Sequence, residues 1–121
     1  MIGYWVVLIM ILMHWFADFV CQTDWQAKNK SSNNKALLTH TYVYSMLWIP
    51  FALYTFGYSP KFSLFIIITF IAHTITDYFT SRLNTSLYKK NKIHRFFISI
   101  GFDQVLHYVQ LGLTYKLLAN V

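Results

Sequence analysis

The chain has 121 residues, of which 56% are hydrophobic and 20% aromatic, while only 12% carry a charge. About a quarter of the residues of a soluble domain are charged, so the composition argues against an ordinary soluble fold, and the length against several domains. The formal net charge is +6, but the basic residues lie between apolar runs. That pattern is typical of the cytoplasmic face of a membrane protein rather than of a nucleic-acid-binding protein. A soluble helical bundle of unusual composition is the alternative.

Four apolar stretches are each close to the roughly 20 residues that a helix needs to cross a bilayer. They cover roughly residues 2–21, 36–56, 62–80 and 96–118. The second stretch contains Pro50, where we expect a kink. The sequence therefore predicts an all-α polytopic membrane protein whose single domain, residues 1–121, is an antiparallel bundle of four transmembrane helices.

The connections between these stretches differ in charge. The first, over residues 22–35, and the third, over residues 81–95, together hold eight of the ten Lys and Arg residues. The second is a tight turn at residues 57–60. Because Lys and Arg are retained on the cytoplasmic side, we expect an integral membrane protein with both termini outside the cytoplasm. The first residues lack a basic segment and a small-residue cleavage site, so we do not expect a cleaved signal peptide.

Pairs of histidine and aspartate, four residues apart, recur inside the apolar stretches. The pairs are His14 with Asp18, His73 with Asp77 and, in reversed order, Asp103 with His107. Four-residue spacing puts both side chains on one face of a helix. The fourth helix runs opposite to the first and third, so its reversed order brings every aspartate to the same, more cytoplasmic level. His40 lies about one turn inside the second helix, at that level.

Two layers of metal ligands result, separated by about 6 Å along the helix axes. The shallow layer holds Asp18, His40, Asp77 and Asp103, and the deeper layer holds His14, His73 and His107. Imidazole and carboxylate are common ligands of zinc, iron and manganese. Seven such groups suit one ion with outer carboxylates, or two neighbouring ions. We predict a divalent metal near the cytoplasmic face, with zinc favoured over manganese or iron.

A metal ion in such a site acidifies bound water, which makes a metal-dependent hydrolase the leading hypothesis. A lipid phosphate or an isoprenoid phosphate is the expected substrate, because the site is close to the membrane surface. The candidate ligands or general bases are Asp18, Asp77 and Asp103, which the sequence does not separate. Lys30 and Arg82, beside the expected mouth, are candidates for binding the phosphate. The sequence has no Gly-rich phosphate loop and no serine or thiol nucleophile motif.

Other functions remain open at this point. Ionisable residues inside a membrane are costly and indicate function, yet the same pairs could join helices through hydrogen bonds. A non-enzymatic membrane effector of the exclusion or immunity type would act on a membrane-protein partner, or as a homo-oligomer, with a structural metal. A proton or metal transporter requires polar residues along the whole bundle, whereas residues 6–12 and 64–70 offer few. A holin-like pore-forming protein is a further alternative, but this function does not account for the His and Asp layers.

These residues also carry a resemblance to a known family. The motifs are His14-x-x-x-Asp18-Phe19-x-x-Gln22-Thr23-Asp24-Trp25, then Lys30, His40, His73-x-x-x-Asp77 and Asp103-Gln104-x-x-His107. They resemble the domain of unknown function 3307 family, small integral membrane proteins of bacteria and their phages. The resemblance implies an integral protein of the bacterial inner membrane, of a length that suits a phage accessory protein, and no particular reaction. The chain is also distantly similar to bacterial membrane-bound metal-dependent hydrolases, which carry intramembrane His and Asp motifs.

Overall fold

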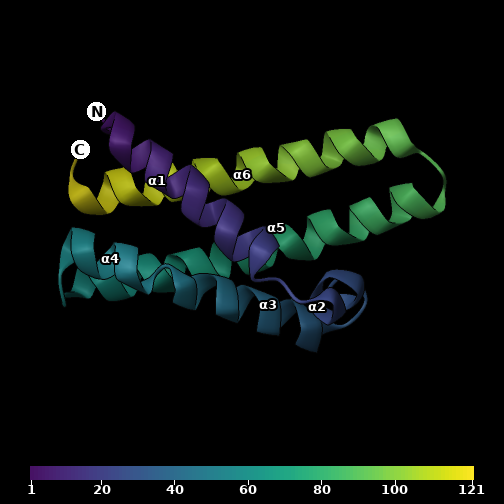
Figure 1. Cartoon of the computed structure of the whole chain (residues 1–121), viewed down its shortest axis with the longest axis horizontal. Helices are drawn as coiled ribbons and strands as arrows, with labels where there is room; N and C mark the ends of the chain where they lie inside the picture. The colour runs from purple at the N-terminus through teal and green to yellow at the C-terminus, as the bar shows by residue number, and fades with distance from the viewer.

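The computed structural model describes residues 1–121 and contains helices but no strands, which confirms the all-α prediction. The elements are α1 (Tyr4–Trp15), η1 (Phe16–Val20), α2 (Asp24–Asn29), α3 (Asn34–Leu47), α4 (Ile49–Phe56), α5 (Pro60–Lys89) and α6 (Ile93–Ala119). The segment η1 continues α1 as one π-helical turn. Helices α5 and α6 form a long antiparallel hairpin, α3 and α4 pack along α5, and α1 crosses α6 (Figure 1).

The third and fourth helices are longer than predicted. The connection expected over residues 81–95 is mostly helical, and the chain reverses only at residues 90–92. Hydropathy identifies the apolar part of a helix, but the charged residues that follow it are also good helix formers, and no Gly or Pro interrupts them. The turn contains Asn91 with φ of 56°, in the left-handed region that Asn tolerates best among side-chain-bearing residues.

The first connection contains a short helix, α2, that was not predicted. The side chain of Thr23 accepts a hydrogen bond from the backbone N–H of Gln26, and the side chain of Gln26 accepts one from the backbone N–H of Thr23. This reciprocal arrangement is a capping box. The Thr-x-x-Gln spacing is therefore the sequence signal for α2, which ends just before Lys30.

The expected kink at Pro50 is confirmed, because the second helical pass is divided into α3 and α4 at Trp48. Pro50 stands in the first turn of α4, where its missing N–H costs no helical hydrogen bond. The backbone N–H of Trp48 donates a hydrogen bond to the carbonyl oxygen of Ser45 at 3.2 Å. The break lets α3 and α4 both follow the surface of α5.

Two helical stretches are long and apolar enough to cross a membrane by length and composition. They are Asn34–Phe56, which comprises α3 and α4, and Pro60–Lys89, which is α5. The apolar helix Tyr4–Val20 is shorter, and α6 is not among the candidate spans. Polar residues in the middle of α6, among them Asp103, Gln104 and His107, lower its hydropathy. The structure therefore has four helical passes, two of which have the character of membrane spans.

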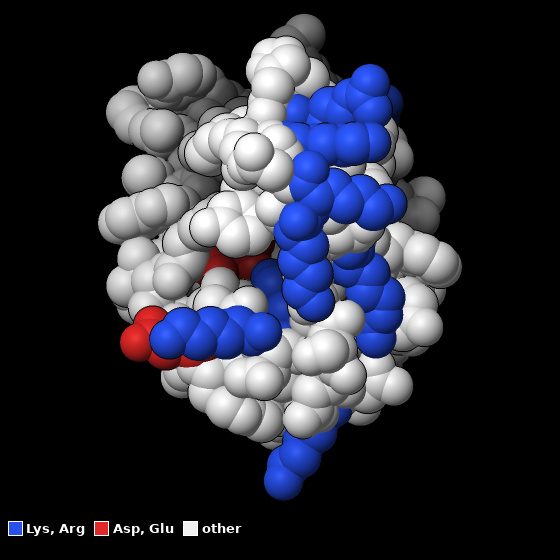
Figure 2. Space-filling model, turned by 90° about the vertical axis from the view of Figure 1, so that its right-hand side faces the viewer, with Lys and Arg blue, Asp and Glu red and all other residues white.

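Polar and apolar groups are distributed unlike those of a soluble protein. Of the 25 buried residues, 13 are polar or charged, while large apolar side chains such as Phe97, Phe102 and Leu117 are exposed. An apolar core includes Trp48 and Phe65 and has members on α4 and near the end of α6. Helix α4 and both termini lie at the same end of the molecule (Figure 1). Lys and Arg gather at the opposite end, around α2 and the α5–α6 turn (Figure 2). The buried His and Asp residues lie between these two ends, on α1, η1, α3, α5 and α6.

Candidate metal centre

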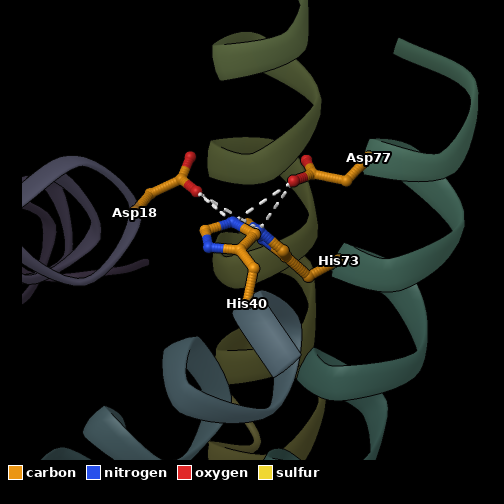
Figure 3. Close-up of side chains that lie close together, drawn as sticks. All are labelled: Asp18, His40, His73 and Asp77. Atoms are coloured by element: carbon orange, nitrogen blue, oxygen red, sulfur yellow. Dashed lines mark hydrogen bonds and ion pairs between the residues drawn. The ribbon is translucent and has the colours of Figure 1, made fainter. Parts of the chain in front are cut away.

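Four buried side chains from three elements converge near the middle of the molecule (Figure 3). We call this set the tetrad: Asp18 from η1, His40 from α3, and His73 and Asp77 from α5. Each of the four residues is at most 4% exposed. One ligand atom of each lies within 4.8 Å of those of the other three. The tetrad therefore unites residues from both predicted layers.

The spacing within the tetrad fits a tetrahedral metal ion. His40 Nε2 lies 2.9 Å from Asp18 Oδ1 and 3.3 Å from Asp77 Oδ2. His73 Nε2 lies 3.4 Å from Asp18 Oδ1 and 3.5 Å from Asp77 Oδ2, and the two Nε2 atoms are 3.4 Å apart. Zinc bonds of 2.0–2.1 Å in a tetrahedron place neighbouring ligand atoms about 3.3–3.4 Å apart. Two imidazoles and two carboxylates also form a suitable ligand set for zinc.

Local helix geometry explains how the tetrad forms. His73 and Asp77 share one face of α5 through their four-residue spacing, and α3 packs on α5 so that His40 faces them. The π-helical turn η1 carries Asp18 toward these residues. Such wide turns redirect side chains and are frequent at functional sites. The Tyr44 ring stacks on the His73 ring with centroids 3.8 Å apart, which fixes the ring plane, whereas His73 Nδ1 is buried without a partner.

A second group of ligands adjoins the tetrad from α6. His107 Nε2 lies 3.1 Å from Asp77 Oδ1 and 3.3 Å from Asp103 Oδ1. Ligand atoms of Asp18, Asp103 and His107 also lie within 4.8 Å of one another. Asp103 is oriented by Thr80, whose hydroxyl donates to Oδ1 at 2.6 Å. The predicted reversed pair on α6 therefore meets the other two pairs, as the layering argument requires.

His14 lies beside the tetrad with both ring nitrogens engaged elsewhere. Its Nε2 is 2.7 Å from the amide oxygen of Gln104, and its Nδ1 is 2.8 Å from the hydroxyl of Tyr44. Because an amide oxygen only accepts, Nε2 carries the proton and Nδ1 accepts from Tyr44. Its Nε2 is also 3.5 Å from Asp18 Oδ2. This position suits an orienting residue, and the role of His14 as a ligand stays a prediction.

The two basic candidates lie in different surroundings. Lys30 Nζ is 3.1 Å from Asp77 Oδ2. Burial alone would lower the pKa of Lys30, but the carboxylates of Asp77 and Asp18 outweigh this effect and raise it. Lys30 is thus charged at neutral pH. Arg82 instead donates to Asn34 Oδ1 and to the backbone carbonyl of Tyr78, both at 3.0 Å, on the outside of α5.

Sequence reasoning missed two residues that orient members of the site. Tyr44 contacts His14 and stacks on His73, and Thr80 donates to Asp103. Their helical spacing is the signal that could have found them, since Tyr44 stands one turn after His40 and Thr80 one turn after Asp77. A lone Tyr or Thr in an apolar helix otherwise has no distinguishing pattern.

A cavity of about 540 Å³ reaches this centre from the basic end of the molecule. We call it the entrance cavity, and Asp18, Lys30 and Asp103 belong to its lining. In Figure 2, acidic atoms are visible in a hollow surrounded by other side chains, with basic side chains beside it. Of the tetrad, Asp18 alone lines the cavity, so the cavity reaches one edge of a buried centre.

Comparisons with known proteins give one match. No curated protein and no solved structure matches the chain. The sequence profile of a family described as "Protein of unknown function (DUF3307)" matches residues 6–121. This match covers every residue of the tetrad, together with Lys30, Asp103 and His107. The chain therefore belongs to the DUF3307 family.

Proposed function

We propose that this chain is a membrane-embedded, zinc-dependent hydrolase whose metal ion is bound by the tetrad. The observation that carries the proposal is the distance between tetrad ligand atoms, 2.9–3.5 Å where contacts are found, at a centre that an open cavity reaches. A tetrad held only by hydrogen bonds has no need for two Nε2 atoms to face each other. A shared positive ion explains why both imidazoles and both carboxylates point to one place.

The membrane setting is supported by the surface of the molecule. Exposed apolar side chains cover helices whose buried faces are polar, and contiguous apolar surface of that kind needs lipid or a partner. We propose that all four helical passes lie in the bacterial inner membrane, with the basic end in the cytoplasm. Buried ionisable residues in such helices indicate function.

The proposed chemistry divides the three aspartates into two roles. A zinc ion lowers the pKa of a bound water to about 7. Asp18 and Asp77 are ligands in the tetrad, whereas Asp103 lies outside it and lines the entrance cavity. A carboxylate there can take the proton of the attacking water, directly or through one further water. Thr80 and Gln104 hold Asp103 for that role.

The open cavity favours a hydrolase over a non-catalytic effector with a structural metal. Structural zinc sites hold four protein ligands and no water, whereas catalytic sites also bind a water. The tetrad supplies four protein ligands, so the hydrolase requires a water as a fifth ligand, which the entrance cavity would supply beside Asp18. A transporter requires a polar path to the far end, but the apolar core, with Trp48, Phe65 and Leu111 fully buried, fills that half of the molecule. The entrance cavity leads to the centre from one side.

Metal content tests the tetrad. We expect purified wild-type protein, after zinc loading, to hold one zinc per chain. His73→Ala should hold less than about a tenth of that, since it removes one of four ligands. His94→Ala is the matched control, because His94 is exposed on α6, and it should keep the wild-type content. Wild-type protein without bound zinc would overturn the proposal, and two zinc ions per chain would make Asp103 a ligand rather than a base.

Hydrolysis tests the proposed reaction. The zinc-loaded protein should hydrolyse 4-nitrophenyl phosphate or 4-nitrophenyl butyrate, and a chelator should stop it. Asp103→Asn should keep zinc but lower kcat about 10²–10⁴-fold, the range expected for loss of a general base. Asp24→Asn, on the exposed start of α2, is the control and should be unchanged. The reaction assignment fails if neither ester is hydrolysed, or if Asp103→Asn retains the full rate.

A further inference from the structure

The entrance cavity contains polar atoms that the protein leaves without partners. Gln22 Oε1, Ser81 Oγ and Asn84 Oδ1 are each buried and lack a hydrogen-bond partner, and all three residues line the cavity. Buried polar groups are nearly always hydrogen-bonded, because leaving one unpaired costs about 1–3 kcal/mol. Three such atoms, in residues that line one cavity, indicate a place for a polar ligand or water.

Cationic side chains surround the same space. Three lysines line the cavity. Lys28 belongs to α2, Lys30 follows the last residue of α2, and Lys89 is the last residue of α5. Lys30 Nζ lies 3.1 Å from Asp77 Oδ2, so the cationic wall of the cavity adjoins the tetrad. Ammonium groups together with hydroxyl and amide groups are suited to an anion with several acceptor oxygens, such as a phosphate.

The charge of the centre makes anion binding depend on the metal. Asp18, Asp77 and Asp103 with Lys30 give a net charge of −2 when the histidines are neutral. An anion entering the cavity beside Asp18 and Asp103 is repelled under those conditions. One divalent ion in the tetrad brings this net charge to zero. The charge that faces an entering anion is then that of Lys28 and Lys89, which is positive.

Another part of the wall is apolar. Phe19, Phe96 and Ile100 line the cavity, on helices whose outer surfaces also carry exposed apolar side chains. A ligand that filled the cavity would therefore contact cationic and polar groups with one part and aromatic and aliphatic groups with another. A volume of about 540 Å³ falls within the range of ligand pockets, about 300–1,000 Å³.

We infer that the entrance cavity binds the phosphate group of an amphiphilic phosphate monoester, with its apolar tail along the Phe19 and Phe96 wall. This assignment rests on the proposed metal centre. The phosphate contacts the lysines and the unpaired polar atoms, and its phosphorus faces the attacking water. In the reaction the water oxygen bonds to phosphorus and the bond from phosphorus to the alcohol oxygen breaks. The proton that Asp103 takes from water passes to the leaving alkoxide, which yields the alcohol and inorganic phosphate.

A binding experiment with a non-hydrolysable probe separates this inference from the proposed reaction. The probe is hexylphosphonate, whose carbon–phosphorus bond the reaction does not break, titrated calorimetrically into the full-length protein in a maltoside detergent. Inorganic phosphate and hexanol are the two partial probes. We expect hexylphosphonate to bind zinc-loaded protein at least about tenfold more tightly than metal-free protein, and more tightly than either partial probe. If inorganic phosphate binds as tightly as hexylphosphonate, the apolar tail contributes nothing and the amphiphilic ligand is wrong. If hexanol binds as tightly as hexylphosphonate, the phosphate site is wrong.

Variants then locate the bound phosphonate. Lys30→Gln should weaken hexylphosphonate binding about tenfold or more, the loss expected for a charge-assisted hydrogen bond, with its zinc content measured alongside. Ser81→Ala should weaken binding several-fold while leaving the Tm of the ligand-free protein unchanged or raised, since its hydroxyl has no partner to lose. Lys90→Gln is the charge control, because Lys90 lies at the same end but does not line the cavity.

The two proposals fail separately. If neither Lys30→Gln nor Ser81→Ala changes the affinity for hexylphosphonate, the assignment of the cavity is wrong, even if zinc-dependent hydrolysis of 4-nitrophenyl butyrate is found. Binding that depends on these residues, without hydrolysis of any ester, upholds the phosphate site and overturns the hydrolase.

Discussion

At the scale of single residues, identical spacing leads to different surroundings. His73 and Asp77 both belong to the tetrad. In the first pair only Asp18 does, because both nitrogens of His14 are engaged by Tyr44 and Gln104. The partner that each side chain meets comes from another helix, so the spacing along one helix fixes the face but not the contact.

His14→Ala tests this division between ligand and orienting residue. We expect the variant to hold one zinc per chain but to bind it about 10–100-fold more weakly, which is the usual effect of losing a residue that orients a ligand. A competition titration against a chromogenic chelator measures the affinity. Loss of stoichiometric zinc, as expected for His73→Ala, would instead make His14 a ligand.

The candidate site was predictable from sequence to the extent that helices determine it. The spacing of the three pairs and the reversed order of Asp103 and His107 suffice to predict that these residues meet. The division into a tetrad and a second group depends on side-chain directions across helices and on the π-helical turn around Asp18, which hydropathy and spacing do not encode. Side-chain direction also separates the two basic candidates. Lys30 contacts Asp77 in the site, whereas Arg82 donates to Asn34 and Tyr78 outside it.

At the scale of elements, α2 matters because it ends at the centre. Its capping box begins at Thr23, and Lys30 follows its last residue and contacts Asp77. The charged and polar segment around α2 looks like a loop by composition, since six residues are too few for a helical hydrophobic period. Hydropathy failed in the same way at the basic end of α5, where the helix continues beyond its apolar part.

Removing the cap should loosen α2. Thr23→Ala loses a hydrogen bond at the helix N-terminus, an effect of about 1 kcal/mol, and local opening becomes about fivefold more frequent. The rate of tryptic cleavage after Lys28 should rise by that factor when opening limits cleavage through its equilibrium. Thr39→Ala, an exposed position on α3, should cleave at the wild-type rate. An unchanged rate for Thr23→Ala would mean that packing rather than the cap holds α2.

At the scale of the whole molecule, charge is distributed unevenly along the long axis. The termini share one end and most Lys and Arg the other. Four helical passes were predictable because each carries a long apolar run. Only two of the four passes have the length and hydropathy of a membrane span, because polar residues such as Asp103 and His107 lower the hydropathy of α6. The polar residues of the centre and the apolar residues that would identify a membrane span therefore occur in the same helix.

Labelling of single cysteines tests the proposed orientation. In a Cys21→Ser background, a membrane-impermeant maleimide applied to right-side-out inner-membrane vesicles should label Asn120→Cys but not Lys90→Cys. Inverted vesicles should give the opposite pattern. Labelling of both positions from one side would contradict a bundle that places the termini and the α5–α6 turn on opposite faces.

X-ray absorption at the zinc edge examines the tetrad itself, without any assumption about substrate or activity. The zinc-loaded protein should show four protein nitrogen or oxygen neighbours and one water oxygen at about 2.0–2.2 Å, with the outer-shell scattering of two imidazole rings from His40 and His73. His73→Ala should lose one imidazole contribution if any zinc remains. A sulfur neighbour at about 2.3 Å, or a shell without imidazole scattering, would contradict zinc binding by Asp18, His40, His73 and Asp77.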